Sequence, residues 1–297
     1  QKYLDFAKQT GDFALGLQDK DPKSPTFGGI RLGPGGDPNF EGDQHLGHDA
    51  AQPAYEQIFA TEVAIDSHAL LSMLAAETGE ARFQSGMDLA RQWLERVALN
   101  RAEHRWNRGY RKSPDKPDKA IATDIHAWGI SALGIDTLDA FEPGLAEKME
   151  KFVEKNCRVT VDWTRPDGAK IRVTGFDFID HASVKTLQRP PMVSPEWSFQ
   201  MANAYRRLED DFAKKGETQK SEIFRSKREE LIQSVMAMAV STDGALAFQY
   251  ASLPDALIGH EYRTPLQGNF STIGVAYAIL ALKGFDPLRP PPAKHAG

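Results

Sequence analysis

The chain has 297 residues, of which 41% are hydrophobic and 26% are charged, and its formal net charge is −5 at pH 7. This is the composition of an ordinary globular protein, and the acidic balance excludes a general nucleic-acid binder. The single cysteine, Cys157, excludes an internal disulfide, and no apolar run reaches the roughly 18 to 20 residues that a membrane-spanning helix needs.

An amphipathic helix is predicted over 2–17, followed by a loop over 18–57 that is rich in Gly and Pro. A loop of this length is either a functional lid or a segment that follows the surface. It contains His45, His48 and Asp49, whose side chains are of the metal-binding type. Their short spacing, with no third ligand nearby in sequence, leads us to expect no metal site.

A helical hairpin is predicted over 61–77 and 81–99, with Thr61 as the cap of its first helix. The loop at 101–119 is basic and carries two aromatic residues, Trp106 and Tyr110. Such a loop suits an acidic polysaccharide, although an ordinary solvated loop can have the same composition.

An apolar helix is predicted over 123–133 and stops at Gly134, with a more polar partner over 143–156. Alternating residues around a turn at 165–168 predict an inserted β-hairpin near 158–174, and a second long loop follows at 175–193. The remaining elements are helices at 195–212, 220–240 and 271–283, a mostly irregular stretch at 242–267, and a tail at 288–297.

The sequence at the start of the helix at 123 is loosely repeated near the end of the chain. Residues 122–133 (ATDIHAWGISAL) align without a gap with 271–282 (STIGVAYAILAL). Apolar helices begin near 61, 122, 195 and 271, and amphipathic helices follow the first three of them. A helix that is apolar nearly all round must be buried, so this alternation predicts an inner and an outer ring of helices. We therefore expect a mainly α fold, an (α/α) toroid with fewer than six recognisable hairpins, as a single domain over 1–297.

Three stretches make the chain resemble the six-hairpin glycosidase-like superfamily of (α/α) toroids. They are Thr61–Asp66, Thr123–Trp128, and Ser271–Gly284 followed by Phe285-Asp286-Pro287. The resemblance implies a carbohydrate-active protein, either a glycoside hydrolase or a polysaccharide lyase. Terpenoid-cyclase toroids share the architecture, but their acidic metal-binding runs do not occur in this sequence.

Inner helices of a toroid run parallel, so their N-termini meet at one end of the ring. Glycoside hydrolysis needs two carboxylates, and aromatic rings are common platforms for sugars. The catalytic candidates are Asp124, Glu196 and Glu62, and the substrate-binding candidates are Trp128, Trp197, His126, Asp66, Trp106 and Tyr110. An acidic residue in the first turn of a helix also stabilises that helix, so each of these acids has a purely structural alternative.

A polysaccharide lyase would use other residues, because Tyr or His removes a proton from the sugar in β-elimination. The candidates for that chemistry lie in the later loops and are Asp177, Asp180, His181, His260, Glu261 and Tyr262.

The leading hypothesis is a hydrolase or lyase that acts without a cofactor on an extracytoplasmic polysaccharide, and the basic loop favours an acidic one. The chain begins at Gln1 rather than Met, so we expect that an N-terminal segment has been removed or left out, for which a cleaved signal peptide is one explanation. The alternatives are a non-catalytic toroid that binds a glycan or a protein partner in the cell envelope, and a cyclase-type enzyme with an apolar cavity.

Overall fold

The computed structural model describes residues 2–34, 57–110, 117–166, 168–242, 244–259 and 262–289. The chain packs as two compact units, Gln1–Ile121 (unit 1) and Ala122–Gly297 (unit 2). The expectation of one domain over 1–297 stays a prediction. The expected loop at 18–57 and tail at 288–297 lie partly outside the described residues, and the described residues of both are mostly irregular.

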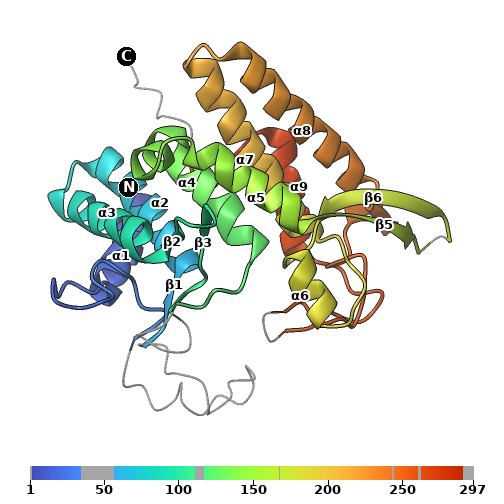
Figure 1. Cartoon of the computed structure of the whole chain (residues 1–297), viewed down its shortest axis with the longest axis horizontal. Coiled ribbons are helices and arrows are strands. Elements are labelled where there is room, and N and C mark those ends of the chain that lie inside the picture. The colour runs from blue at the N-terminus through green and yellow to red at the C-terminus, as the bar shows by residue number, and fades with distance from the viewer. Residues whose placement is uncertain are drawn as a thin grey trace. The chain divides into compact units, whose positions relative to one another are not determined.

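Unit 1 is built on the helices α1 (Lys2–Leu17), α2 (Thr61–Thr78) and α3 (Ala81–Trp93) (Figure 1). The α2–α3 hairpin turns at Gly79, whose φ of 68° is left-handed and ends α2. Leu15 of α1 packs with Leu71, Leu74 and Phe83 of the hairpin, which confirms the predicted hairpin and gives unit 1 its own apolar core.

Short strands complete unit 1. A π-helical turn (Leu94–Ala98) extends α3, and β2 (Leu99–Asn100) then pairs with β3 (Arg105–Trp106). β1 (Phe59–Ala60) pairs with β4 (Gly109–Tyr110), which brings the residues before α2 against the middle of the basic loop. The helix predicted over 81–99 is therefore an α-helix that changes to a π-turn.

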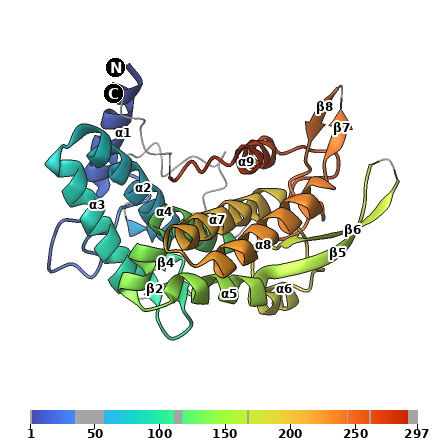
Figure 2. The same cartoon turned by 90° about the horizontal axis from the view of Figure 1, so that it is seen from above.

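Unit 2 contains two helical hairpins. The first is α4 (Thr123–Phe141) with α5 (Leu145–Cys157), and the second is α7 (Pro195–Lys214) with α8 (Thr218–Met236). Figure 2 shows α4, α7 and α8 side by side, with α7 packed against both α4 and α8. The final helix, α9 (Thr272–Lys283), also packs on α7, so α7 is the central helix of unit 2.

The inserted β-hairpin is confirmed as β5 (Arg158–Thr164) and β6 (Lys170–Phe176), which project from the helices (Figure 1). A second short hairpin joins β7 (Val240–Thr242) and β8 (Ala245–Ala247). The loop predicted over 175–193 contains a short helix, α6 (His181–Thr186), which is too short to show a helical periodicity in the sequence. Its cap is Asp180, whose carboxylate accepts hydrogen bonds from the backbone N–H groups of Ala182 and Ser183.

Three sequence expectations need correction. Helix α4 does not stop at Gly134; it continues to Phe141 after one non-helical residue. Thr61 does not cap α2, because its hydroxyl donates to the carbonyl of Asn107 instead. Helix α9 is not buried on most of its surface, since Ile273, Ile279 and Leu282 are 45%, 53% and 55% exposed.

Candidate functional site in unit 2

The first turn of α4 is fixed by hydrogen bonds to the segment that follows β6. The hydroxyl of Thr123 donates to the carbonyl of Asp177 at 2.6 Å, and its backbone N–H donates to the carbonyl of Phe178 at 3.2 Å. Asp124 follows directly, is 9% exposed, and accepts a hydrogen bond from the N–H of Ile125. These bonds hold the Asp124 carboxylate at the start of α4, beside residues 177–178.

The start of α7 is tied to the same segment. Ser194 caps α7 by accepting the N–H of Trp197, and its own N–H donates to the carbonyl of Phe176. Just before it, Val193 exchanges two hydrogen bonds with Ser252, which brings in the loop after β8. The helix starts of α4 and α7 and the segments 176–178 and 250–252 thus form one bonded group, which we call the unit-2 site.

Glu196 occupies the first turn of α7 and is 8% exposed. Burial raises the pKa of its carboxyl to about 7, although hydrogen bonds from Gln200 and Trp197 oppose the shift. The Gln200 amide nitrogen lies 3.3 Å from Oε1 of Glu196, while its oxygen is buried without a partner among the described residues. If the Gln200 amide flips, a protonated Glu196 can donate a hydrogen bond to the amide oxygen. Gln200 is therefore compatible with the protonated form of Glu196 as well as the ionised one.

Three aromatic rings lie at the same place. The ring of Phe178 packs edge to face on Trp197 at 4.7 Å and stacks on Tyr250 at 5.5 Å between centroids. Burial raises the pKa of Tyr250 to about 12, and the charges of Glu196 and Asp124 add to the shift. Both carboxylates are therefore within electrostatic range of one tyrosine hydroxyl, and Tyr250 as a residue is half-buried.

The two other candidates on α4 differ in their environment. Trp128, one turn after Asp124, is half-buried, and its indole N–H is buried with no hydrogen-bond partner among the described residues. His126 is fully buried, with Nδ1 2.7 Å from the carbonyl oxygen of Ala122 and its ring stacked on Phe152 of α5. Trp128 thus keeps part of its surface exposed, whereas His126 packs α4 against α5.

The remaining acidic candidates belong to unit 1. Glu62 is half-buried in the first turn of α2, and Asp66 is exposed one turn later. Although part of Asp66 is exposed, the protein around its carboxyl group desolvates it and, with the charge of Glu62 in addition, raises its pKa to about 7. The catalytic role of Glu62 and the binding role of Asp66 stay predictions.

Three arginines of the basic loop of unit 1 form ion pairs with acidic residues. Arg101 pairs with Glu95, Arg105 with Glu103 and Arg108 with Asp118. Within this loop the ring of Trp106 is fully buried, and Tyr110 is half-buried in β4. Substrate binding by these two aromatic residues stays a prediction.

Two of the residues considered for a lyase, Asp177 and His181, have structural partners in unit 2. Asp177 receives a two-pronged ion pair from Arg189, at 2.6 and 2.9 Å, and also the N–H of Met192. His181 lies with Nε2 2.9 Å from the carbonyl oxygen of Arg158. Tyr262 is 62% exposed, while His260 and Glu261 lie outside the described residues, as do His45, His48 and Asp49.

The sequence alone missed Tyr250, Phe178 and Gln200. Gln200 could have been found, because it lies four residues after Glu196 and so shares its face of the helix. Phe178 and Tyr250 lie in irregular segments, where no periodicity signals which residues meet. Among the described residues, no cluster of His, Cys, Asp or Glu is arranged to hold a metal ion, and no helix could span a membrane.

Solved structures with the same fold are enzymes that act on glycans. An unsaturated glucuronyl hydrolase from Bacillus sp. GL1, responsible for the degradation of glycosaminoglycan, aligns with a TM-score of 0.54 and 15% identity over 95% of this chain and 70% of its own. An unsaturated glucuronyl hydrolase specific for heparin aligns with a TM-score of 0.53 and 12% identity over 94% and 66%. A family 76 glycoside hydrolase from a bovine Bacteroides thetaiotaomicron strain aligns with a TM-score of 0.55 and 12% identity, over 95% of this chain and 51% of its own.

These alignments confirm the fold expected from the sequence, that of the six-hairpin glycosidase-like (α/α) toroids, with small strand pairs added. At 12% to 15% identity the likeness establishes the fold alone. No protein-family model matches the sequence, and no curated protein matches it.

Proposed function

We propose that this chain is a glycoside hydrolase in which Glu196 is the general acid and Asp124 is the ionised second carboxylate. The observation that carries the proposal is the convergence of these two buried carboxylates on the half-buried Tyr250, from the first turns of two adjacent helices. Hydrolysis of a glycosidic bond needs one protonated and one ionised carboxyl group near the scissile bond.

In the proposed reaction the Glu196 proton passes to the glycosidic oxygen as the bond between that oxygen and the anomeric carbon breaks. The negative charge of Asp124 faces the positive charge that develops on the sugar. A water then adds its hydroxyl to the anomeric carbon and leaves its proton on a carboxylate, so one water is consumed per bond. A pKa of about 7 keeps Glu196 largely protonated in mildly acidic solution.

The aromatic residues of the site support a sugar as the substrate. Trp128 and Tyr250 are half-buried, so each keeps an accessible part, and Tyr250 lies within electrostatic range of Asp124 and Glu196. Aromatic faces pack well against the C–H faces of sugars.

The likeness to the solved enzymes supports a proposal for the substrate class. Two of them are glucuronyl hydrolases, and their names specify glycosaminoglycan or heparin. We therefore propose an oligosaccharide released from an acidic polysaccharide as the substrate, and a site of action outside the cytoplasm, where such polymers occur. Fractionation of the producing cells, with detection of the chain by immunoblot, tests the location.

The activity test uses acidic and neutral oligosaccharides and measures both new reducing ends and the absorbance of unsaturated uronates. Wild type is compared with Asp124→Asn and Glu196→Gln, and with Glu147→Gln as a control. Glu147 is also an acid in the first turn of a helix, but it belongs to α5 and pairs with Lys220.

The proposal expects reducing ends from wild type and Glu147→Gln and a loss of at least about a hundredfold in the two site variants. Newly formed unsaturated product that persists in both site variants would instead show a lyase that uses other residues. Glycan binding without any turnover by wild type would show the non-catalytic alternative.

A further inference from the structure

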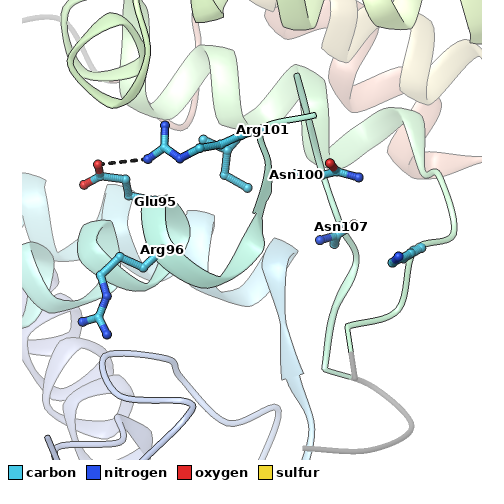
Figure 3. A pocket seen from close by; sticks show the side chains of 7 residues that line it. Glu95, Arg96, Asn100, Arg101 and Asn107 are labelled. Carbon is cyan, nitrogen blue, oxygen red and sulfur yellow. Dashed lines mark hydrogen bonds and ion pairs between the residues drawn. The ribbon is translucent and has the colours of Figure 1, made fainter. Parts of the chain in front are cut away.

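Unit 1 contains an open pocket of about 640 Å³ beyond the end of α3. Figure 3 shows its lining side chains, with the ion pair between Glu95 and Arg101 dashed. The lining consists of charged and amide side chains with a single aliphatic residue, namely Glu95, Arg96, Leu99, Asn100, Arg101, Asn107 and Lys119. A pocket of this composition suits a polar ligand rather than an apolar one.

The π-helical turn and the β2–β3 pair position this lining. Leu99 donates its backbone N–H to the carbonyl of Leu94, five residues earlier, so the turn is wider than an α-helical turn. π-Turns of this kind are frequent at functional sites. The turn carries Glu95 and Arg96, and the adjoining strand carries Asn100, so one continuous stretch supplies most of the pocket wall.

The charge of the pocket is positive although the whole chain is acidic. Arg96, Arg101 and Lys119 contribute cations, whereas Glu95 is the only acid among the lining residues. Glu95 pairs with Arg101, and the structure records no ion pair between Arg96 or Lys119 and another described residue. Two exposed cations therefore remain available to an anion.

A buried amide adds a directional donor. Asn107 is 6% exposed, and its Oδ1 is held by Nη1 of Arg105 at 3.3 Å, which orients its amide. No hydrogen bond is recorded between Nδ2 of Asn107 and a described residue. This nitrogen, in a residue that lines the pocket, complements the two cations as a hydrogen-bond donor to an anionic oxygen.

We propose that this pocket binds the carboxylate or sulfate group of an acidic saccharide. Arg96 and Lys119 supply the charge, and Asn107 donates the orienting hydrogen bond. The choice of a saccharide as the carrier of the anion rests on the proposed function. The pocket is then a binding subsite, and it contributes affinity for acidic over neutral glycans without taking part in bond cleavage.

The test measures binding by calorimetry at low ionic strength, in the Glu196→Gln background so that turnover is suppressed. The ligands are a uronate oligosaccharide, its sulfated counterpart and a neutral oligosaccharide of equal length. Arg96→Gln and Lys119→Gln should each weaken binding of one or both acidic ligands roughly three- to fivefold and leave the neutral ligand unaffected. Whichever acidic ligand responds more strongly identifies the anion.

Two further variants make the result specific. Glu95→Gln removes the only acid from the lining and should strengthen acidic binding, a gain that misfolding cannot imitate. Lys20→Gln removes an exposed cation of unit 1 that is not part of the lining, and it should change nothing. The changes in affinity for the acidic ligands should become smaller as salt is added, because salt screens the charges.

The inference is overturned if wild type binds neutral and acidic ligands equally or binds neither. It is also overturned if Arg96→Gln, Lys119→Gln and Glu95→Gln leave acidic binding unchanged, or if an oligonucleotide binds as well as the saccharides do. Its failure is distinguishable from that of the proposed function. Pocket-dependent binding without hydrolysis by wild type counts against the hydrolase alone, whereas hydrolysis without pocket-dependent binding counts against the pocket alone.

Discussion

The guanidinium group of Arg207, on α7, fills the space beside Gly134 where α4 loses its helical geometry. Gly134 has φ 69° and ψ 177°, a conformation that side-chain-bearing residues avoid. Arg207 donates to the carbonyl of Ser131 at 2.7 Å, and Asp211 accepts the N–H of Ile135 at 3.1 Å and pairs with Arg207 at 2.6 Å. Side chains of α7 thus replace the backbone bonds that the break in α4 removes.

Gly134→Ala is expected to lower the free energy of unfolding by about 3 to 5 kcal/mol, from backbone strain and from displacement of the buried Arg207–Asp211 pair. A Cβ atom at Gly134 would overlap the Arg207 guanidinium. Gly144→Ala is the matched control, because φ is 73° there and the nearest atom, Lys148 Cε, is 3.9 Å away. It should cost only about 1 kcal/mol. Equal losses in urea unfolding of the two variants would contradict this explanation.

Stability should depend on pH through Glu196. The pKa of Glu196 is about 7 in the folded chain and 4.5 as its ordinary value, so the folded state binds the proton more tightly. The stability of wild type should therefore fall as pH rises from 4.5 to 7, by up to about 3 kcal/mol from this group, and change little above that range.

Glu196→Gln lacks this titration, so it should gain stability relative to wild type over the same pH range. Asp66, whose pKa is also raised to about 7, is present in both proteins and cancels in the difference. Denaturant unfolding at pH 4.5, 6 and 8 measures this difference in the free energy of unfolding between Glu196→Gln and wild type. A difference that does not vary with pH would mean that Glu196 titrates normally.

Gln200 is expected to act as a positioning residue for Glu196. Its amide N–H stabilises the ionised carboxylate, so Gln200→Met should raise the pKa of Glu196 further. The basic limb of the pH–rate profile should then move to higher pH, with a smaller change in the maximal rate than in Glu196→Gln. A purely structural role would lower the rate at every pH and leave the shape of the profile as in wild type.

Thr61 and Thr123 make the same contacts in the two units. Each begins an apolar helix, donates its hydroxyl to a carbonyl of a later segment (Asn107 or Asp177), and donates its N–H to the next carbonyl along. Thr61→Val and Thr123→Val should each cost about 1 to 2 kcal/mol in unfolding experiments, because both hydroxyls are fully buried.

Thr160→Val provides the control for both substitutions. Its hydroxyl bonds to that of Thr174 on the exposed face of the β5–β6 hairpin, so the loss should stay within about 0.5 kcal/mol. If the buried and exposed threonines prove equally tolerant, the shared contact is not a determinant of stability.

These two threonines also show what the sequence could predict. The sequence pattern of a hydroxyl residue, an acidic residue and an apolar helix correctly located α2 and α4. It could do so because a buried helix has an apolar composition that the sequence shows directly. The role of the hydroxyl was wrong for Thr61, since its partner, Asn107, is far away in sequence and a local capping rule cannot anticipate it.

The same distinction applies to the site. Asp124, Glu196, Trp128 and Trp197 could be nominated because each lies in the first turns of a recognisable helix. Tyr250 could not, since it reaches the site through the bonds between Ser252 and Val193, which join segments separated by 59 residues. The break at Gly134 was mistaken for the end of a helix for a similar reason, because Arg207 and Asp211 sustain α4 from another helix.

The hydrogen bonds that join Thr123, Phe176, Val193, Ser194 and Ser252 also govern how the unit-2 site can open. The backbone N–H groups of Thr123, Ser194 and Ser252 donate to carbonyls of Phe178, Phe176 and Val193, and those of Phe176 and Val193 donate to serine hydroxyls of the same site. Because each hydrogen bond joins two of these segments, exposing one amide to solvent requires the segments to separate. In deuterium exchange they should therefore share one opening free energy and exchange as a cooperative group. The site would then fluctuate between a closed state and an open one, rather than fray residue by residue.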